Sequence, residues 1–192
     1  MKAITLWQPW ATAIALGLKK YETRDWPAVC DGKAFTGWIL ITAAKAQHDE
    51  GVFRWIQHKM PDAPKTMESG PNMSRRLEYY AAIKDFLTLP FGSAVALAYL
   101  EKSHAVEELA PGQISEQERS WGLYEPGRFA WEFSEIYSFD EPFPVIGRQK
   151  IFNLSSINIL DRATTLIYKK QTEPHDPNRQ TVPSSQSGSA GL

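Results

Sequence analysis

Residues 7–26, WQPWATAIALGLKKYETRDW, contain the pattern that decides the fold. Pro9 is expected at the first helical position, because its fixed backbone angle suits a helix start, and apolar residues follow at core spacing, namely Trp10, Ala13 and Ile14. Gly17 is the natural end of this helix, since glycine readily adopts the left-handed conformation found there. The stretch therefore predicts a short helix that turns sharply into a strand.

The strand expected at residues 21–26 brings charged and aromatic side chains to one face. Side chains alternate along a strand, which places Glu22, Arg24 and Trp26 on one face and Tyr21, Thr23 and Asp25 on the other. Lys19 lies in the turn, close to the face that carries Glu22. The guanidinium of Arg24 suits a phosphate or a base edge, and an indole can stack on a base. A solvent-facing ion pair that stabilises the turn would give the same spacing, so the pattern alone leaves both interpretations open.

The rest of the chain alternates between strands and helices. Further strands are expected at residues 2–6, 38–43, 93–100, 129–137 and 150–154, with an edge piece at Pro142 and Pro144. Residues 47–91 contain a helical insertion, in which Asp49 and Ser74 are candidate caps and Leu77, Tyr80 and Ala81 share one face. Strands early and late, with helices between them, predict an α+β fold built on a small mixed β-barrel.

Composition indicates a globular protein and excludes several classes. The chain has 192 residues, of which 43% are hydrophobic, so it can form a packed core. No run approaches the ~20 apolar residues of a membrane span, and the single Cys30 cannot form a disulfide within the chain. A cytoplasmic protein is therefore expected. The net charge of −1 excludes a polycation, yet residues 1–46 and 147–192 each carry three more basic than acidic residues and can still form a local cationic cleft.

Two further groups of residues extend the candidate site. Lys45 follows the apolar strand at 38–43, and the turn-rich residues 121–131, WGLYEPGRFAW, place Tyr124 and Arg128 before another strand. The common catalytic signatures, including a P-loop, a G-x-S-x-G elbow and H-E-x-x-H, are missing from the sequence. The four histidines are scattered, and with one cysteine a structural zinc site is not expected. Neither a metal nor another cofactor is therefore predicted.

These motifs, in this order, resemble the ASCH domain, a branch of the PUA-like superfamily of small β-barrels. The resemblance lies in Trp7-Gln-Pro-Trp10, in the G-x-K-x-x-E-x-R pattern from Gly17 to Arg24, in Ala44-Lys45, in Gly127-Arg-Phe-Ala-Trp131 and in the stretch from Gly147 to Leu154. It implies a barrel of five or six strands with a cleft beside the first helix. The residues expected in that cleft map to Lys19, Glu22, Arg24 and Lys45, with Tyr124 and Arg128 added from the later motif.

The resemblance also suggests how the chain is divided. The ASCH/PUA-like domain is expected to span residues 1–160, with the helical insertion at about 47–91. An extension without an assigned structure follows at 161–170. Residues 171–192 contain three prolines, four serines, two glycines and no aromatic residue, which predicts a disordered tail.

Related domains bind RNA or read modified bases. The leading hypothesis is therefore a nucleic-acid-binding module for RNA or a modified nucleotide. DNA is a weaker candidate ligand, and no membrane partner is expected. The rival hypothesis is a hydrolase. Some small family members are amidohydrolases that deacylate acetylated cytidine with a Thr, a Lys and a Glu, and at least one relative has been described as a ribonuclease. Lys19 matches that Lys, but Glu22 stands where the Thr is expected, so Glu22 would have to act as a general base. A third hypothesis is that the acidic segment 101–141 binds a protein partner.

Overall fold

The computed structural model describes residues 1–46, 77–78, 80–83 and 88–172. Its main element is a six-stranded sheet with the strand order β2-β7-β6-β5-β1-β8. The strands are β1 (Lys2–Leu6), β2 (Tyr21–Arg24), β5 (Gly37–Ala43), β6 (Ser93–Ala105), β7 (Phe129–Pro144) and β8 (Ile151–Asn153). Only β1 and β5 pair in parallel, so the sheet is mixed. Two short strands, β3 (Val29–Cys30) and β4 (Lys33–Ala34), form a separate ladder.

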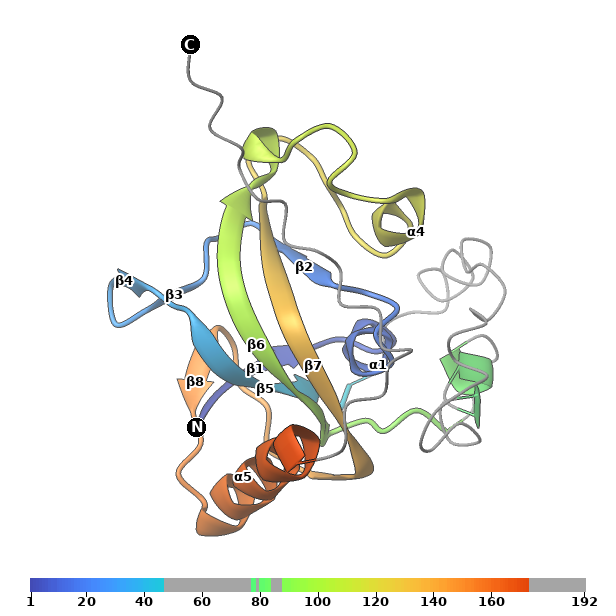
Figure 1. Ribbon diagram of the computed structural model, residues 1–192, viewed down its shortest axis with the longest axis vertical. Helices are drawn as coiled ribbons and strands as arrows, with labels where there is room; N and C mark the ends of the chain where they lie inside the picture. Colours follow the sequence, from blue (N-terminus) through green and yellow to red (C-terminus); the bar gives the residue numbers. More distant parts are fainter. Residues whose placement is uncertain (47–76, 79, 84–87, 173–192) are drawn as a thin grey trace.

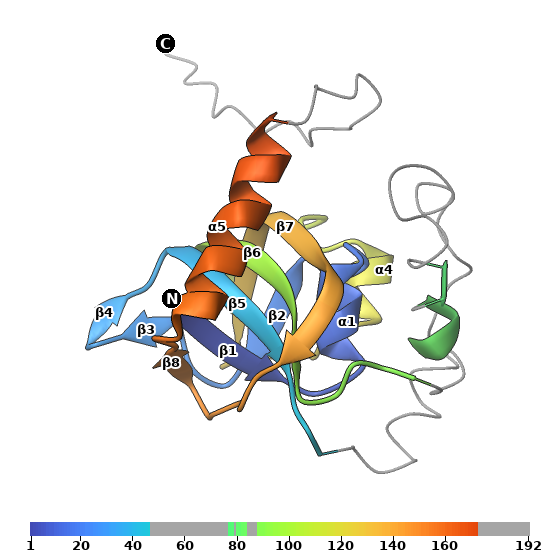
Figure 2. The same cartoon turned by 90° about the horizontal axis from the view of Figure 1, so that it is seen from below.

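The sheet curls into a half-barrel, and helices lie against it (Figures 1 and 2). The helices with defined bounds are the α-helices α1 (Trp10–Ala15), α4 (Glu116–Arg119) and α5 (Ile157–Thr172) and the 3-10 helix η2 (Val106–Glu108). The predicted α+β class and the small mixed barrel-like sheet are therefore confirmed. Within the described part of the chain, no helix has the length and apolar character needed to cross a bilayer.

The strand β5 shows that apolar side chains are buried on both faces of the sheet. Ile39 and Ile41 are fully buried in a cluster that includes Ile14 of α1. Leu40 is buried in a second cluster that includes Ala163 of α5. Strand residues alternate between faces, so a continuous apolar run is stable when both faces are covered. The composition of β5 thus follows from α1 and α5 packing on opposite sides.

The turn from α1 into β2 follows the prediction closely. Gly17 has a positive φ of 73° directly after the C-terminal cap of α1, and the Leu18 amide donates to the Ala13 carbonyl 2.9 Å away. The helix begins one residue later than expected, however, because Pro9 is the N-cap and Trp10 the first helical residue. The buried Gln8 side chain accepts a hydrogen bond from the Thr12 amide at 3.2 Å, which satisfies one free donor of the first turn.

The two long strands extend beyond their predicted ends. β6 continues to Ala105 instead of ending at residue 100, and β7 continues through Pro142 to Pro144. The register between β6 and β7 shifts between Ala94 and Ala96, where the proline-containing end of β7 joins β6. β2 pairs with β7 only as far as Glu132, so among the described strands residues 138–144 have β6 as their one partner. A proline is tolerated at such an edge because it has no amide to donate, which agrees with the predicted edge piece.

The predicted insertion and tail lie mostly outside the described residues. Residues 77–78 and 80–83 are helical, with Tyr80 buried as expected, but Ala81 is exposed and Ala82 and Ile83 are buried instead. The segment 161–170, for which the sequence predicts no structure, belongs to α5. Asp49, Ser74 and residues 173–192 fall outside the description.

Candidate functional site

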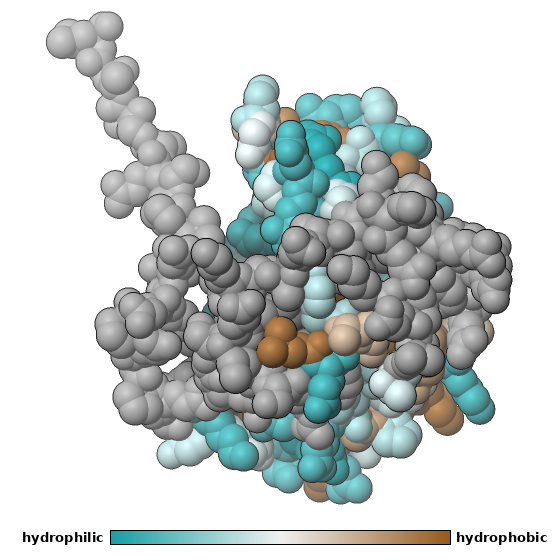
Figure 3. Space-filling model, turned by 90° about the vertical axis from the view of Figure 1, so that its right-hand side faces the viewer, coloured by the Kyte–Doolittle hydropathy of each residue, from teal (hydrophilic) through white to brown (hydrophobic). Residues whose placement is uncertain are grey.

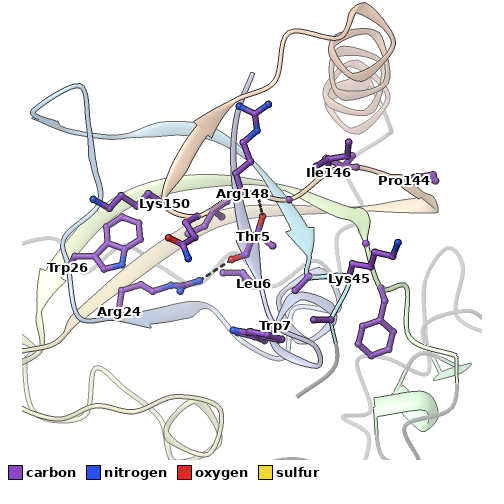
Figure 4. Close-up of a pocket in the computed structure, with 18 of the residues that line it drawn as sticks. Thr5, Leu6, Trp7, Arg24, Trp26, Lys45, Pro144, Ile146, Arg148 and Lys150 are labelled. Atoms are coloured by element: carbon purple, nitrogen blue, oxygen red, sulfur yellow. Dashed lines mark hydrogen bonds between the residues drawn. The ribbon is translucent and has the colours of Figure 1, made fainter. Parts of the chain in front are cut away.

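A cleft of about 1070 Å³ opens where the ends of β1 and β5 meet the segment that joins β7 to β8 (Figure 4). Because β1 and β5 are parallel, with Leu6 opposite Ala43, both strands end at the same edge of the sheet. Trp7 follows β1 at this edge, and Lys45 follows β5. The cleft therefore combines segments that are far apart in the sequence.

Basic and aromatic side chains are prominent in the lining. Four lining residues are basic and one is acidic, namely Arg24, Lys45, Arg148, Lys150 and Asp25. Two indoles also line the cleft, those of Trp26 and of Trp7, which is 41% exposed. Within the described residues, Lys45, Arg148 and Lys150 form no ion pair. The lining thus offers positive charge for phosphates and flat apolar surfaces for bases.

Arg24 reaches the cleft from the last position of β2. One terminal guanidinium nitrogen donates to the Thr5 carbonyl at 3.2 Å, and Nε lies 3.1 Å from Glu22 Oε1 (Figure 4). The side chain of Arg24 is 23% exposed, so its charge remains accessible although two groups hold it. This fixed orientation limits the conformational entropy that Arg24 would lose on binding an anion.

Lys19 and Glu22 lie behind Arg24 and do not line the cleft. Lys19 is 1% exposed, and its Nζ lies 3.3 Å from Glu22 Oε2 and donates to the Tyr21 carbonyl. Glu22 therefore bridges two cations, one buried and one at the cleft. A buried charge is tolerated only when it is paired, which explains why this carboxylate is enclosed by Lys19 and Arg24.

Trp26 is held at the cleft by a second indole. Its ring meets that of Trp131 edge to face, with the ring centroids 4.6 Å apart. The Trp131 indole nitrogen also donates to the Trp26 carbonyl at 3.2 Å. Trp131 is fully buried, so it acts as a rigid support for the partly exposed Trp26.

Tyr124 belongs to a different, closed cluster around Glu118. The Glu118 carboxylate accepts hydrogen bonds from the Lys20 amide at 2.7 Å, the Tyr21 amide at 3.1 Å and the Tyr124 hydroxyl at 3.0 Å. Burial, followed by the negative charge of Glu118, raises the pKa of Tyr124 far above its usual value, so its hydroxyl stays protonated. Tyr124 is not among the residues that line the cleft.

Arg128 also lies away from the cleft. Its guanidinium donates to the Thr23 carbonyl at 3.2 Å, and the Thr23 hydroxyl accepts a hydrogen bond from the Leu123 amide at 3.1 Å. Thr23 therefore faces the loop before β7 and not the side of Arg24, as the alternation along the strand predicts. Of the seven predicted site residues, the structure brings Arg24, Trp26 and Lys45 into the cleft, places Lys19 and Glu22 behind it, and leaves Tyr124 and Arg128 elsewhere.

Sequence reasoning did not single out Arg148 or Lys150 as site residues, nor Glu118 as a structural one. Arg148 and Lys150 follow Gly147 within the last stretch of the family resemblance, but no local pattern connects them to Arg24. Glu118 did carry a signal, since Ser115 and Glu118 have the spacing of a capping box. The Ser115 hydroxyl does accept from the Glu118 amide at 3.1 Å, whereas the Glu118 carboxylate binds the amides of Lys20 and Tyr21 at the start of β2 instead of its own helix.

The acidic segment covers another part of the molecule. Exposed carboxylates occur in the connection between β6 and β7, at Glu107, Glu108, Glu116 and Glu125. Hydrophilic side chains gather on the upper part of the face shown in Figure 3.

The described residues contain no group of three or more His, Cys, Asp or Glu side chains that could hold a metal ion.

Comparisons with known proteins identify similar folds but no similar sequences. No family profile matches the chain, and no curated protein does. The crystal structure of ASCH from Zymomonas mobilis is 16% identical, with a TM-score of 0.43, and the match covers 86% of this chain and 94% of that chain. Two single-residue variants of that protein, also 16% identical, give TM-scores of 0.41 and 0.39, with 87% and 88% of this chain and 96% and 94% of theirs covered. These three solved structures are ASCH structures, and the likeness concerns the fold.

Proposed function

We propose that this protein is a nucleic-acid-binding module that holds single-stranded RNA in the cleft between β1, β5 and the β7–β8 connection. The observation that carries the proposal is that four basic residues and two tryptophans line one cleft, whose charged lining includes a single carboxylate. Cations that neutralise phosphates supply affinity, and aromatic faces stack on unpaired bases. Both requirements are met by residues of this cleft.

The exposed indole of Trp7 favours a single strand over a duplex. Stacking needs a free base face, and the bases of a duplex are already stacked on one another. The resemblance of the sequence motifs to ASCH domains supports RNA as the ligand. Within the cleft, Arg24 and Lys45 contact phosphates, while Trp7 and Trp26 offer the stacking surfaces.

Lys19 and Glu22 act on this site through Arg24. Glu22 orients the Arg24 guanidinium, and Lys19 balances the charge of Glu22 in the protein interior. The hydrolase alternative needs Lys19 Nζ at a substrate atom, whereas the Lys19 side chain is 1% exposed and already bound to Glu22 and the Tyr21 carbonyl. We therefore assign both residues a positioning role.

The proposal is tested by fluorescence anisotropy with a labelled single-stranded RNA at two salt concentrations. Lys45→Ala and Arg24→Ala should each weaken binding about fivefold near 0.1 M salt and lower the slope of log K against log salt by about 0.7, which is the loss of one phosphate contact. Lys102→Ala, which removes an exposed lysine outside the cleft, should leave both values unchanged. Wild-type affinity in both cleft variants would contradict the proposal.

The same samples also separate binding from turnover. Chromatography of wild-type protein incubated with RNA and with acetylated cytidine should return the substrates unchanged. A product that forms with the wild type and disappears with Lys19→Ala, in a variant that remains folded, would favour the hydrolase.

A further inference from the structure

The segment 145–150, between β7 and β8, is held against the sheet although it has no regular secondary structure. The Val145 amide donates to the Gly92 carbonyl at 2.9 Å, and the Arg148 amide donates to the Thr5 hydroxyl at 3.0 Å. These bonds attach the segment to the start of β6 and to β1. Its backbone is therefore fixed at one wall of the cleft.

Gly147 is what allows the segment to approach β1 so closely. A Cβ atom at this position would lie 2.6 Å from the Thr5 hydroxyl oxygen and 2.8 Å from its methyl carbon. The Thr5 hydroxyl is also 3.0 Å from that of Thr42, so it has little freedom to move away. Any side chain at position 147 would have to displace the segment from the wall.

The fixed segment presents two cations that have no acidic partner within the described residues. Arg148 and Lys150 are exposed residues that lie among those lining the cleft. No ion pair or hydrogen bond involves either side chain among the residues that the structure describes. Unpaired cations on a rigid backbone form a favourable site for phosphate, because little has to be ordered or displaced when the anion binds.

The cations extend along the cleft instead of meeting at one point. Figure 4 shows Lys150 and Trp26 at one end and Lys45 at the other, with Arg24, Arg148 and Trp7 between them. The volume of about 1070 Å³ lies at the upper end of the range of pockets for drug-sized molecules, which is about 300–1,000 Å³, and a nucleoside is smaller than most such molecules. A single nucleoside would fill only part of this volume and could not contact all four basic residues.

We propose that the segment 145–150 is a phosphate-binding rim, and that the cleft takes a single-stranded oligoribonucleotide of at least two nucleotides instead of a free nucleoside. The backbone of the strand runs along the rim, with successive phosphates at Arg148 and Lys150. Its bases face Trp7 and Trp26. This inference rests on the proposed function and specifies the ligand of the same site.

The test is a competition experiment, in which unlabelled uridine, uridine monophosphate and oligouridylates of two, four and eight nucleotides displace a labelled eight-nucleotide RNA. With the wild-type protein, the tetranucleotide should compete at least about a hundredfold better than the monophosphate, because each added phosphate contact contributes about fivefold near 0.1 M salt and stacking adds to it. The double variant Arg148→Gln/Lys150→Gln should bind the labelled RNA about 25-fold more weakly. Its salt slope should be lower by about 1.4.

Two controls separate the rim from a general effect of charge. The double variant Lys33→Gln/Lys102→Gln removes two exposed lysines outside the cleft and should retain wild-type affinity. Gly147→Ala keeps every charge but displaces the rim, so it should lose affinity while its thermal midpoint shows that it remains folded.

The outcomes distinguish this inference from the proposed function. RNA binding that depends on Arg24 and Lys45 but not on Arg148 and Lys150 would overturn the rim alone. Equal competition by the monophosphate and the tetranucleotide would overturn the oligonucleotide and leave a nucleotide-binding cleft. No RNA binding by the wild-type protein would overturn both.

Discussion

The two faces of β2 present their side chains in opposite ways. On one face, Arg24 points into an open cleft with Lys45, and both keep accessible charge. On the other, the Tyr21 amide and the Tyr124 hydroxyl donate hydrogen bonds to the buried carboxylate of Glu118. Glu118 is 7% exposed and uses its carboxylate to hold the amides at the start of the strand.

This difference shows that a motif with several charged and aromatic residues does not by itself indicate a ligand-binding site. Tyr124 and Arg128 come from a conspicuous motif, yet their hydrogen bonds are made to Glu118 and to the Thr23 carbonyl. A polar group that is enclosed together with its partners stabilises the fold, whereas a cation that is exposed in a cleft, such as Lys45, has a free energy of binding to gain from an anion. The comparison predicts that variants on the two faces affect different measurements.

The largest effect is expected when the buried charge of Lys19, which is paired with Glu22, is removed. Lys19→Met should lower the free energy of unfolding by about 3–5 kcal/mol, because it removes one partner of a buried ion pair. The measurement is urea denaturation followed by tryptophan fluorescence. A loss of RNA affinity with unchanged stability would instead place Lys19 in contact with the ligand.

A smaller loss of stability is expected when Glu118 is replaced on the face of β2 that carries Tyr21, which we call the closed face. Glu118→Ala leaves the Lys20 and Tyr21 amides and the Tyr124 hydroxyl without their acceptor, which should cost about 3 kcal/mol of the free energy of unfolding. The folded fraction should bind RNA with near wild-type affinity, in contrast to Lys45→Ala. If Glu118→Ala abolished RNA binding while the protein stayed folded, the two faces would not be independent.

The smallest effect is a change with pH on the closed face. Burial raises the pKa of Tyr21 from 10.0 to about 12. Between these values the folded protein keeps a proton that the unfolded chain has lost, so the free energy of unfolding should fall as the pH rises from 10 to 12. Urea denaturation across this range should show a weaker decline for Tyr21→Phe than for the wild type. An identical decline in both proteins would assign it to other groups.

Local features of the sequence were the ones that could be predicted. The end of α1 at Gly17 and the opposite orientations of Thr23 and Arg24 depend on backbone geometry within a few residues, and both are confirmed. The start of α1 was wrong by one residue, because Pro9 serves as the N-cap. The ends of β6 and β7 were missed, since a register shift and an edge position allow strands to continue through residues with low strand propensity.

By itself the sequence determined the helix, the sharp turn and the strand that places Glu22 and Arg24 on one side, because these depend on φ angles and on the two-residue period of a strand. The strand ends at Arg24, so Trp26 reaches the cleft from the bend that follows it. Only the tertiary structure decided which charges are accessible. It enclosed Lys19, closed the network around Glu118, and brought Arg148 and Lys150 to the cleft that contains Arg24. The Glu118 network and the placement of the segment with Arg148 depend on contacts between residues more than 90 positions apart, such as those of Lys20 with Glu118 and of Thr5 with Arg148. Local spacing contains no information about such contacts.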